Sequence, residues 1–308
     1  MTALGRTTAL GRTMRGIAAM VASQFALAVN DTFVKLASES LPLGEVIFLR
    51  GVFASILVGA VVVAMGLVRY VLLLRHRLVF WRIFGELGAT YFFLLALFKM
   101  PLANVSIIFQ ATPLTVTAAA ALFLGEFVGW RRWTAILIGF VGVAIVVRPG
   151  LGGFQIYAVL VLVSVLFVVL RDLATRALPL AVPAMVLTLA TAVSVTVMGA
   201  LLGLNERWLS PSWTVLAQLL AAAAFLSVGY LMIIAAMRLG DMSAVVPFRY
   251  SNVVFAIILG MLVWGDIPDA ITIAGSAIII STGLYTLYRE RRVAALPRAA
   301  TSGPVPPA

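Results

Sequence analysis

The sequence predicts an all-α membrane protein of ten transmembrane helices, arranged as two inverted five-helix repeats. Hydrophobic residues make up 63% of the 308 residues, charged residues make up 11%, and the mean hydropathy is +1.13. These values lie outside the range of soluble proteins, which would aggregate with so much apolar surface. Apolar stretches of about 20 residues follow one another, each long enough to cross a bilayer core of ~30 Å. An internal repeat of about 140 residues is the third observation.

Ten apolar segments can be recognised between the two ends of the chain. Their connections are very short, so consecutive segments are expected to be antiparallel neighbours. The predicted segments lie at residues 16–37, 43–67, 79–99, 101–124, 131–148, 154–175, 181–203, 213–237, 242–264 and 267–288.

The two ends of the chain differ from these segments. Residues 1–15 contain Thr-Ala-Leu-Gly-Arg-Thr twice in tandem and are too polar and basic for a signal-peptide core, so we predict a disordered cytoplasmic tail, with Met14 as an alternative start. Residues 289–308 form a basic tail that is rich in proline and alanine and is also expected to be disordered. Between the tails we expect a first five-helix repeat at 16–148 and a second at 152–288.

Basic residues predict how the chain crosses the membrane. Both tails and the connections after the even-numbered segments carry most of the arginines, and we count Arg171 and Arg176 with the sixth connection. The positive-inside rule therefore predicts that both termini are cytoplasmic, in a multi-pass protein of the bacterial inner (plasma) membrane. The basic residues expected on the other side are Lys35, Lys99, Arg148 and Arg207.

The two halves of the chain resemble each other. Leu124-Gly-Glu126 follows the fourth segment as Trp264-Gly-Asp266 follows the ninth, and Asp31-x-x-x-Lys35 is echoed by Asp172-x-x-x-Arg176. Because five is an odd number, the second copy enters the membrane from the opposite side, which makes the repeat inverted. Inverted repeats are typical of secondary transporters, whose substrate site lies near the midplane between the halves.

With these features the sequence resembles the EamA type of the drug/metabolite transporter (DMT) superfamily. The resemblance covers about residues 16–288 and rests on two five-helix units, short loops, the Gly-Glu pair that ends at Glu126 and the run from Arg238 to Pro247. It implies that helices one to four and six to nine surround a central cavity. Helices five and ten would pack at the periphery, where a homodimer contact is expected. Asp266 stands where the family usually has glutamate, which keeps the charge.

We place six charged residues, three acidic and three basic, in the membrane portion of the chain. Counting ~1.5 Å per residue places Glu86 and Arg249 at similar depth in the inner part, so we predict that they pair across the halves. Asp31 and Lys35 are four residues apart on one helix face and can pair with each other. For Asp31 and Arg50, a structural ion pair and a role in substrate binding or gating both remain open. Lys35 and Glu45 lie near segment ends, where we interpret them as snorkelling to headgroups.

Polar residues around a proline of the ninth segment predict the substrate site. A guanidinium in hydrocarbon is costly unless it is paired or hydrated, and Pro247 leaves a carbonyl without its helical partner, so Arg249 is expected to face a cavity. Pro113 marks a matching polar region in the fourth segment. These polar groups could instead cross-link helices, and the aromatic residues could serve packing. The predicted substrate-binding residues are Arg249, Tyr250, Asn252, Gln110, Thr112 and Tyr91, and the predicted ion-pair or proton-coupling residues are Glu86, Asp31, Lys35 and Arg50, with Glu86 favoured for the proton.

Several function classes are excluded by what the chain contains. It has no cysteine, and its one histidine, His76, lies in a basic loop, so we expect no metal site, no cofactor and no enzymatic activity. No phosphate-binding glycine loop with its lysine occurs, which argues against an ATPase. The net charge of +11 lies mostly in loops and tails, so we expect a lipid bilayer and a small-molecule substrate as partners, and no nucleic acid.

The function predicted from the sequence is transport of a small organic metabolite by alternating access. Export of amino acids or related compounds is favoured through the family resemblance. Uptake of riboflavin or a nucleoside-like metabolite is the alternative. The alternative from a different functional class is a membrane scaffold that does not transport.

Overall fold

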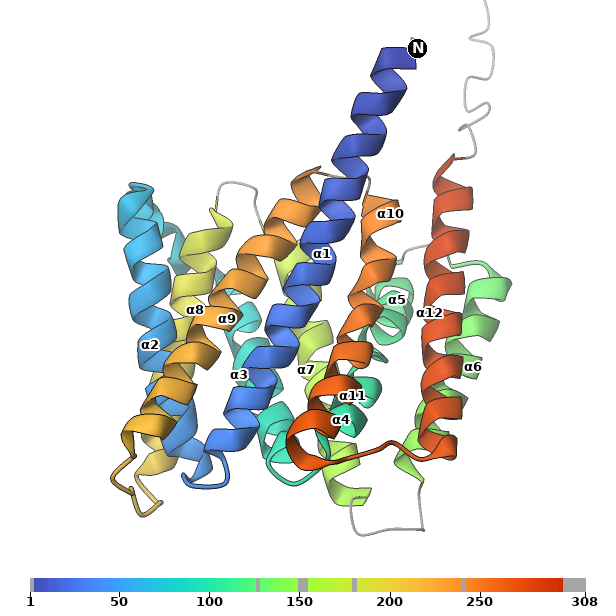
Figure 1. Ribbon diagram of the computed structural model, residues 1–308. Helices are drawn as coiled ribbons and strands as arrows, with labels where there is room; N and C mark the ends of the chain where they lie inside the picture. The colour runs from blue at the N-terminus through green and yellow to red at the C-terminus, as the bar shows by residue number, and fades with distance from the viewer. Residues whose placement is uncertain (1–2, 126–127, 149–154, 179–181, 240–241, 296–308) are drawn as a thin grey trace, which may run out of the picture.

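Figure 1 shows a computed structural model of the chain, which is a bundle of long helices. The structure describes residues 3–125, 128–148, 155–178, 182–239 and 242–295, and every regular element in these ranges is helical. The elements are α1 Ala3–Ala37, α2 Leu43–Ala64, η1 Leu67–Arg75, α3 Arg77–Leu97, α4 Leu102–Phe109, α5 Thr112–Phe123, α6 Trp130–Val147, α7 Gln155–Arg176, α8 Ala184–Gly203, α9 Trp213–Leu239, α10 Met242–Val245, η2 Val246–Tyr250, α11 Ser251–Trp264 and α12 Ala270–Ala295.

Ten spans within the described ranges are long and apolar enough to cross a membrane, which confirms the predicted number. The start of α1 and the described end of α12 lie on the same side of the bundle, as an even number of crossings requires (Figure 1). We call this side the N-terminal face and the other side the far face. That the N-terminal face is the cytoplasmic one stays a prediction.

The helices extend further into the tails than we predicted. α1 begins at Ala3, so residues 3–15 are helical where we expected disorder, and α12 continues to Ala295. No proline interrupts residues 3–37, so the helix can propagate backwards from the membrane span at little cost. Three parts of the sequence discussed above lie outside the described residues: Glu126, the residues between the two predicted repeats, and residues 296–308.

Helices of one predicted repeat pack mainly on helices of the other. The principal pairs are α1 with α9, α2 with α8, α3 with α7, and α6 with α12, while α4 packs on α11. In the predicted repeat, α1 corresponds to α7 and α3 corresponds to α9. The pair of α1 with α9 is therefore equivalent to the pair of α7 with α3. Each of the other pairs joins helices that correspond to each other. The pattern is therefore consistent with an inverted repeat related by a pseudo-two-fold axis.

Glycines allow these helix pairs to approach closely. A Cβ on Gly85 of α3 would lie 2.7 Å from the backbone nitrogen of Arg171 in α7, and a Cβ on Gly199 of α8 would lie 2.5 Å from that of Phe48 in α2. Without a hydrophobic driving force between helices in lipid, such close contact is a main source of association energy.

We expect Gly199→Ala to destabilise the bundle by about 1–3 kcal/mol, because the added methyl group meets backbone atoms that cannot rotate away. Thermal unfolding of the purified protein in detergent measures this loss. Gly260→Ala is the matched control, since its Cβ would find Leu102 at 3.9 Å, an ordinary contact, and alanine favours helix more than glycine does. Equal melting temperatures for the two variants would contradict the prediction.

Two of the ten spans are broken, and the breaks occur at the predicted prolines. The fourth span is interrupted between α4 and α5, where Pro113 follows the first residue of α5. The ninth span passes from α10 through the 3₁₀ turn η2, which contains Pro247, into α11. Proline lacks the amide hydrogen that a continuous helix needs and clashes with the preceding turn. Broken helices at matching positions of two repeats are typical of transporter binding sites.

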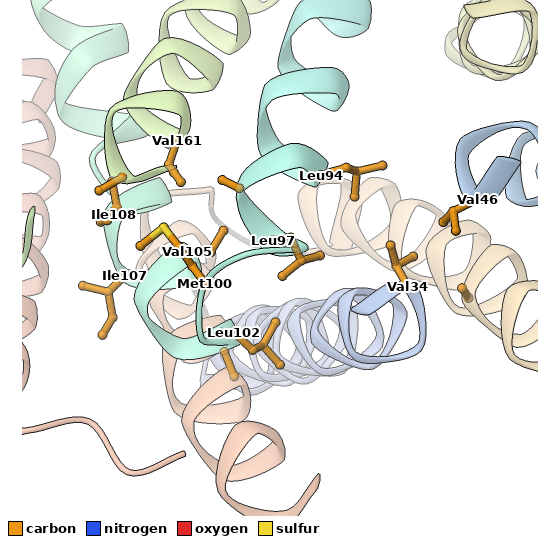
Figure 2. Packing of buried hydrophobic residues seen from close by; sticks show 14 of the residues in the cluster. Val34, Val46, Leu94, Leu97, Met100, Leu102, Val105, Ile107, Ile108 and Val161 are labelled. Atoms are coloured by element: carbon orange, nitrogen blue, oxygen red, sulfur yellow. The ribbon is translucent and has the colours of Figure 1, made fainter. Parts of the chain in front are cut away.

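The largest hydrophobic cluster lies toward the far face. Figure 2 shows side chains from the end of α1, the start of α2, the end of α3, α4 and the start of α7 gathered there. Val34, Leu97, Leu102 and Val161 are each exposed by less than 2%. These side chains form a packed apolar layer in the far-face half of the bundle.

Candidate functional site

The two broken spans are joined by a hydrogen bond. The side-chain amide of Gln110, at the break between α4 and α5, donates a hydrogen bond to the carbonyl oxygen of Arg249 in η2 (3.3 Å). The contact joins the two repeats at the place where both helices are irregular.

Two other predicted site residues hold these breaks in place. The hydroxyl of Thr112 donates to the carbonyl of Phe109 (2.6 Å), which closes the turn between α4 and α5. The side-chain amide of Asn252 donates to the carbonyl of Gln24 in α1 (3.2 Å). Asn252 thus links α11 to α1, whereas the hydrogen bond of Thr112 stays within its own span. A role of either residue in substrate binding stays a prediction.

Arg249 does not pair with Glu86 in the structure, and that prediction is wrong. Glu86 accepts a hydrogen bond from the guanidinium of Arg171 instead (3.1 Å), and Arg171 also binds its neighbour Asp172 (2.9 Å). The reason is the packing of α3 on α7: Gly85 brings the Arg171 backbone against α3, so this guanidinium is the nearest one to Glu86.

Arg249 itself presents an exposed side chain within a membrane span. Its charge lies within electrostatic range of Asp172 and Arg171 in α7 and of its neighbour Tyr250. Because Arg171 already serves both carboxylates, Arg249 has no ion pair within 4 Å among the described residues. It is a cation that is available to a ligand.

Arg82 adds a further cation beside the same carboxylates. Its guanidinium donates to the hydroxyl of Thr191 in α8 (2.5 Å), and its charge interacts with those of Glu86 and Arg171. Tyr230 of α9 lies within electrostatic reach of the same groups. We define the central charged cluster as Arg82, Glu86, Arg171, Asp172 and Arg249, three cations and two anions, which carries one net positive charge.

Sequence reasoning missed Arg82, Arg171, Asp172 and Tyr230. We had counted Arg171 with the basic residues of a loop, whereas it lies five residues before the end of α7, roughly 7.5 Å inside the helix end. An arginine followed directly by an aspartate within the predicted segment 154–175 was the signal that could have revealed it, because such a pair is rarely placed in lipid.

Asp31 and Lys35, which could pair by their spacing, have other partners in the structure. Asp31 accepts a hydrogen bond from the amide of Asn30 (2.9 Å), and the oxygen of that amide faces the guanidinium of Arg50 at 3.5 Å. Lys35 donates instead to two carbonyl groups at the end of α3, those of Leu97 (3.1 Å) and Met100. Helix-end carbonyls have no intrahelical partner, so they compete well for an ammonium group.

Glu45 does not snorkel to the membrane surface. Its side chain is 1% exposed and accepts a hydrogen bond from the backbone nitrogen of Leu209 (3.0 Å). Leu209 lies in the connection before α9, and this hydrogen bond offsets part of the cost of burying the Glu45 carboxylate.

The two predicted tyrosines have mainly packing contacts. Tyr91 lies edge-on against Phe92, with ring centroids 5.1 Å apart. Tyr250 is 5% exposed and its ring lies against Gly283 of α12. A role of either residue in substrate binding stays a prediction, as does proton coupling through Glu86.

A pocket of about 400 Å³ opens at the far face, away from the central charged cluster. Asn104, Asp266 and the ion pair of Arg148 with Asp269 line it. Hydrogen bonds from the side chains of Arg148 and Thr272 hold the pKa of Asp269 below its ordinary value of 3.8. A lowered folded pKa means that the pair is fully formed above pH 4 and is lost only as the pH falls further. The ion pair of Arg148 with Asp269 therefore stays formed over the physiological pH range.

Comparisons with known proteins agree with this architecture. Residues 14–148 match the EamA-like transporter family. The S-adenosylmethionine uptake transporter of Rickettsia conorii is 27% identical over 290 residues, which cover 92% of this chain and 96% of the relative. The pseudopaline exporter of Pseudomonas aeruginosa is 28% identical over 273 residues, covering 86% and 93%.

Two further similarities concern a shorter region and the fold. A riboflavin transporter of Rhizobium johnstonii is 28% identical over 193 residues, 63% of this chain and 64% of the relative. A solved crystal structure superposes with a TM-score of 0.64 at 18% identity and covers 89% of this chain and 99% of the other. At that identity the superposition supports the fold alone.

Proposed function

Because the chain belongs to the EamA-like transporter family of the drug/metabolite transporter superfamily, we propose that it exports an amino acid or a related amino carboxylate by alternating access. The observation that carries this proposal is the meeting of the two broken spans at Gln110 and Arg249, beside a cluster with an excess cation. We place the protein in the bacterial inner membrane with both termini cytoplasmic.

The charges of the site favour a substrate with a carboxylate. Arg249 would bind the carboxylate, since a guanidinium matches its two oxygens. Asp172, which interacts electrostatically with Arg249, would attract an ammonium group on the same molecule. An α-amino carboxylate carries both groups close together, and its binding would leave the net charge of the cluster unchanged.

Uptake of a nucleoside-like compound or riboflavin is the second candidate. S-adenosylmethionine, named for the Rickettsia relatives, is both a nucleoside and an amino carboxylate, so it would satisfy Arg249 equally well. Riboflavin has no carboxylate and would leave Arg249 without a partner. A homodimer through α6 and α12, which pack on each other at one edge of the bundle in Figure 1, stays part of the proposal.

Ligand-induced thermal stabilisation tests this function. Purified protein is heated with amino acids, S-adenosylmethionine, nucleosides and riboflavin, each at a saturating concentration. A ligand of the native state stabilises it by about 2.7 kcal/mol at a hundredfold excess over Kd. Decarboxylated S-adenosylmethionine is the matched control, because it differs by the carboxylate alone.

We expect stabilisation by an amino carboxylate and its loss with the decarboxylated ligand. Stabilisation by riboflavin alone would move the assignment to the second candidate. No stabilisation by any compound of the panel would contradict the proposal and favour a membrane scaffold.

A further inference from the structure

We propose that Lys35 is the latch of a gate at the far face, whose release opens the central charged cluster to that side of the membrane. The inference rests on the proposed alternating access. It concerns which contact holds the present conformation closed, a role that neither the fold nor the family match assigns to a residue.

The two faces of the bundle differ in the way that a gate requires. Toward the far face, Leu97, Val105 and their neighbours form the closed hydrophobic layer of Figure 2, with 1% exposure or less for each of these two. Toward the N-terminal face, Arg249 and Phe248 are exposed within a membrane span. The central charged cluster is thus separated from the far face by this hydrophobic layer.

Lys35 connects three helices at the edge of this layer. Its ammonium group donates to the carbonyls of Leu97 and Met100 at the end of α3 and lies 5.4 Å from the ring centre of Trp264 at the end of α11. A cation over an aromatic face is attracted by the ring quadrupole. The indole nitrogen of Trp264 in turn donates to the carboxylate of Glu39, just beyond α1 (2.7 Å).

These contacts join helix groups that have to separate for the far face to open. α1 packs on α9 and α11, whereas α3 packs on α7 and α8, so Lys35 reaches from one group to the other. A long side chain bound to backbone carbonyls can release them without unfolding either helix, and water can then hydrate both partners. A snorkelling lysine, by contrast, would make no contact whose loss opens the layer.

The absence of cysteine from the chain allows a direct test by labelling. Val105→Cys reports on the closed layer, and a membrane-impermeant maleimide is applied from the far face to protein in lipid vesicles without any substrate. We expect Lys35→Met to raise the labelling rate of the thiol at position 105 about tenfold, since hydrogen bonds to charged groups are lost. Lys99→Met is the control, because Lys99 is an exposed lysine at the same face.

A second reporter separates gating from unfolding. Ile136→Cys lies in α6, outside the layer, and the native side chain is 1% exposed, so its labelling should stay slow in the Lys35→Met background. Equal labelling at position 105 in the Lys35→Met and Lys99→Met proteins, or faster labelling at both reporters, would overturn the latch. Because no substrate is present, the labelling result does not depend on which compound is transported. The labelling experiment can therefore be interpreted even if no ligand stabilises the protein in the thermal screen.

Discussion

Replacing Arg171 with methionine is expected to destabilise the protein by ~3–5 kcal/mol, the largest effect of any single substitution in the central charged cluster. The change removes the guanidinium that binds both Glu86 and Asp172, and the Glu86 side chain is only 13% exposed. A carboxylate left without its partner inside the bundle bears the full cost of its lost solvation. Thermal unfolding in detergent should show a fall of the melting temperature by roughly 10 °C.

The companion variants show whether the ion pair causes this effect. Glu86→Gln combined with Arg171→Met should recover part of the loss, because the charge left without a partner is then removed. Arg131→Met removes an exposed arginine over the ring of Trp130 and should change stability by less than about 1 kcal/mol. An Arg171→Met protein that melts within a degree of wild type would show that Glu86 and Asp172 are solvated without Arg171.

Replacing Arg249 with glutamine is expected to weaken binding of the carboxylate substrate by about 30-fold or more. The variant keeps a long polar side chain but loses the cation for which the described residues offer no ion-pair partner within 4 Å. Loss of one charged partner in a desolvated site costs about 2 kcal/mol or more, which corresponds to this factor in Kd. The concentration dependence of ligand-induced stabilisation measures it.

Two controls accompany this variant. Arg249→Lys keeps the charge without the two-pronged geometry and should bind with intermediate affinity. The stability of unliganded Arg249→Gln should match wild type or exceed it, because no ion pair is broken. Unchanged affinity in Arg249→Gln would remove Arg249 from the substrate site.

The course of the chain through the membrane could be predicted closely from the sequence. Hydrocarbon demands continuous apolar helices, so hydropathy alone located the spans, and Pro113 and Pro247 located the two breaks. Proline acts on its own helix, which is why its effect can be read locally. The ends of α1 and α12 were predicted less well, because a helix that leaves the bilayer ends only where capping or packing stops it.

The ion pairs could not be predicted in the same way. Depth along the helices matched Glu86 with Arg249, but depth does not reveal which helices touch. Because α3 and α7 approach closely at Gly85, Glu86 pairs with Arg171. In the same way, Asp31 and Lys35 have the right spacing to pair, yet Lys35 donates to carbonyl groups at the end of α3, a helix whose position no local pattern describes.

Counterflow in proteoliposomes tests the central claim most directly. Vesicles loaded with a millimolar concentration of the amino carboxylate that stabilises the protein are diluted into a trace of the same compound in radioactive form. A secondary transporter exchanges the two through its alternating site, so we predict transient accumulation of label by wild type and by Arg131→Met, and none by Arg249→Gln. Equal label in wild-type vesicles and protein-free vesicles would contradict transport, and full counterflow by Arg249→Gln would contradict the site.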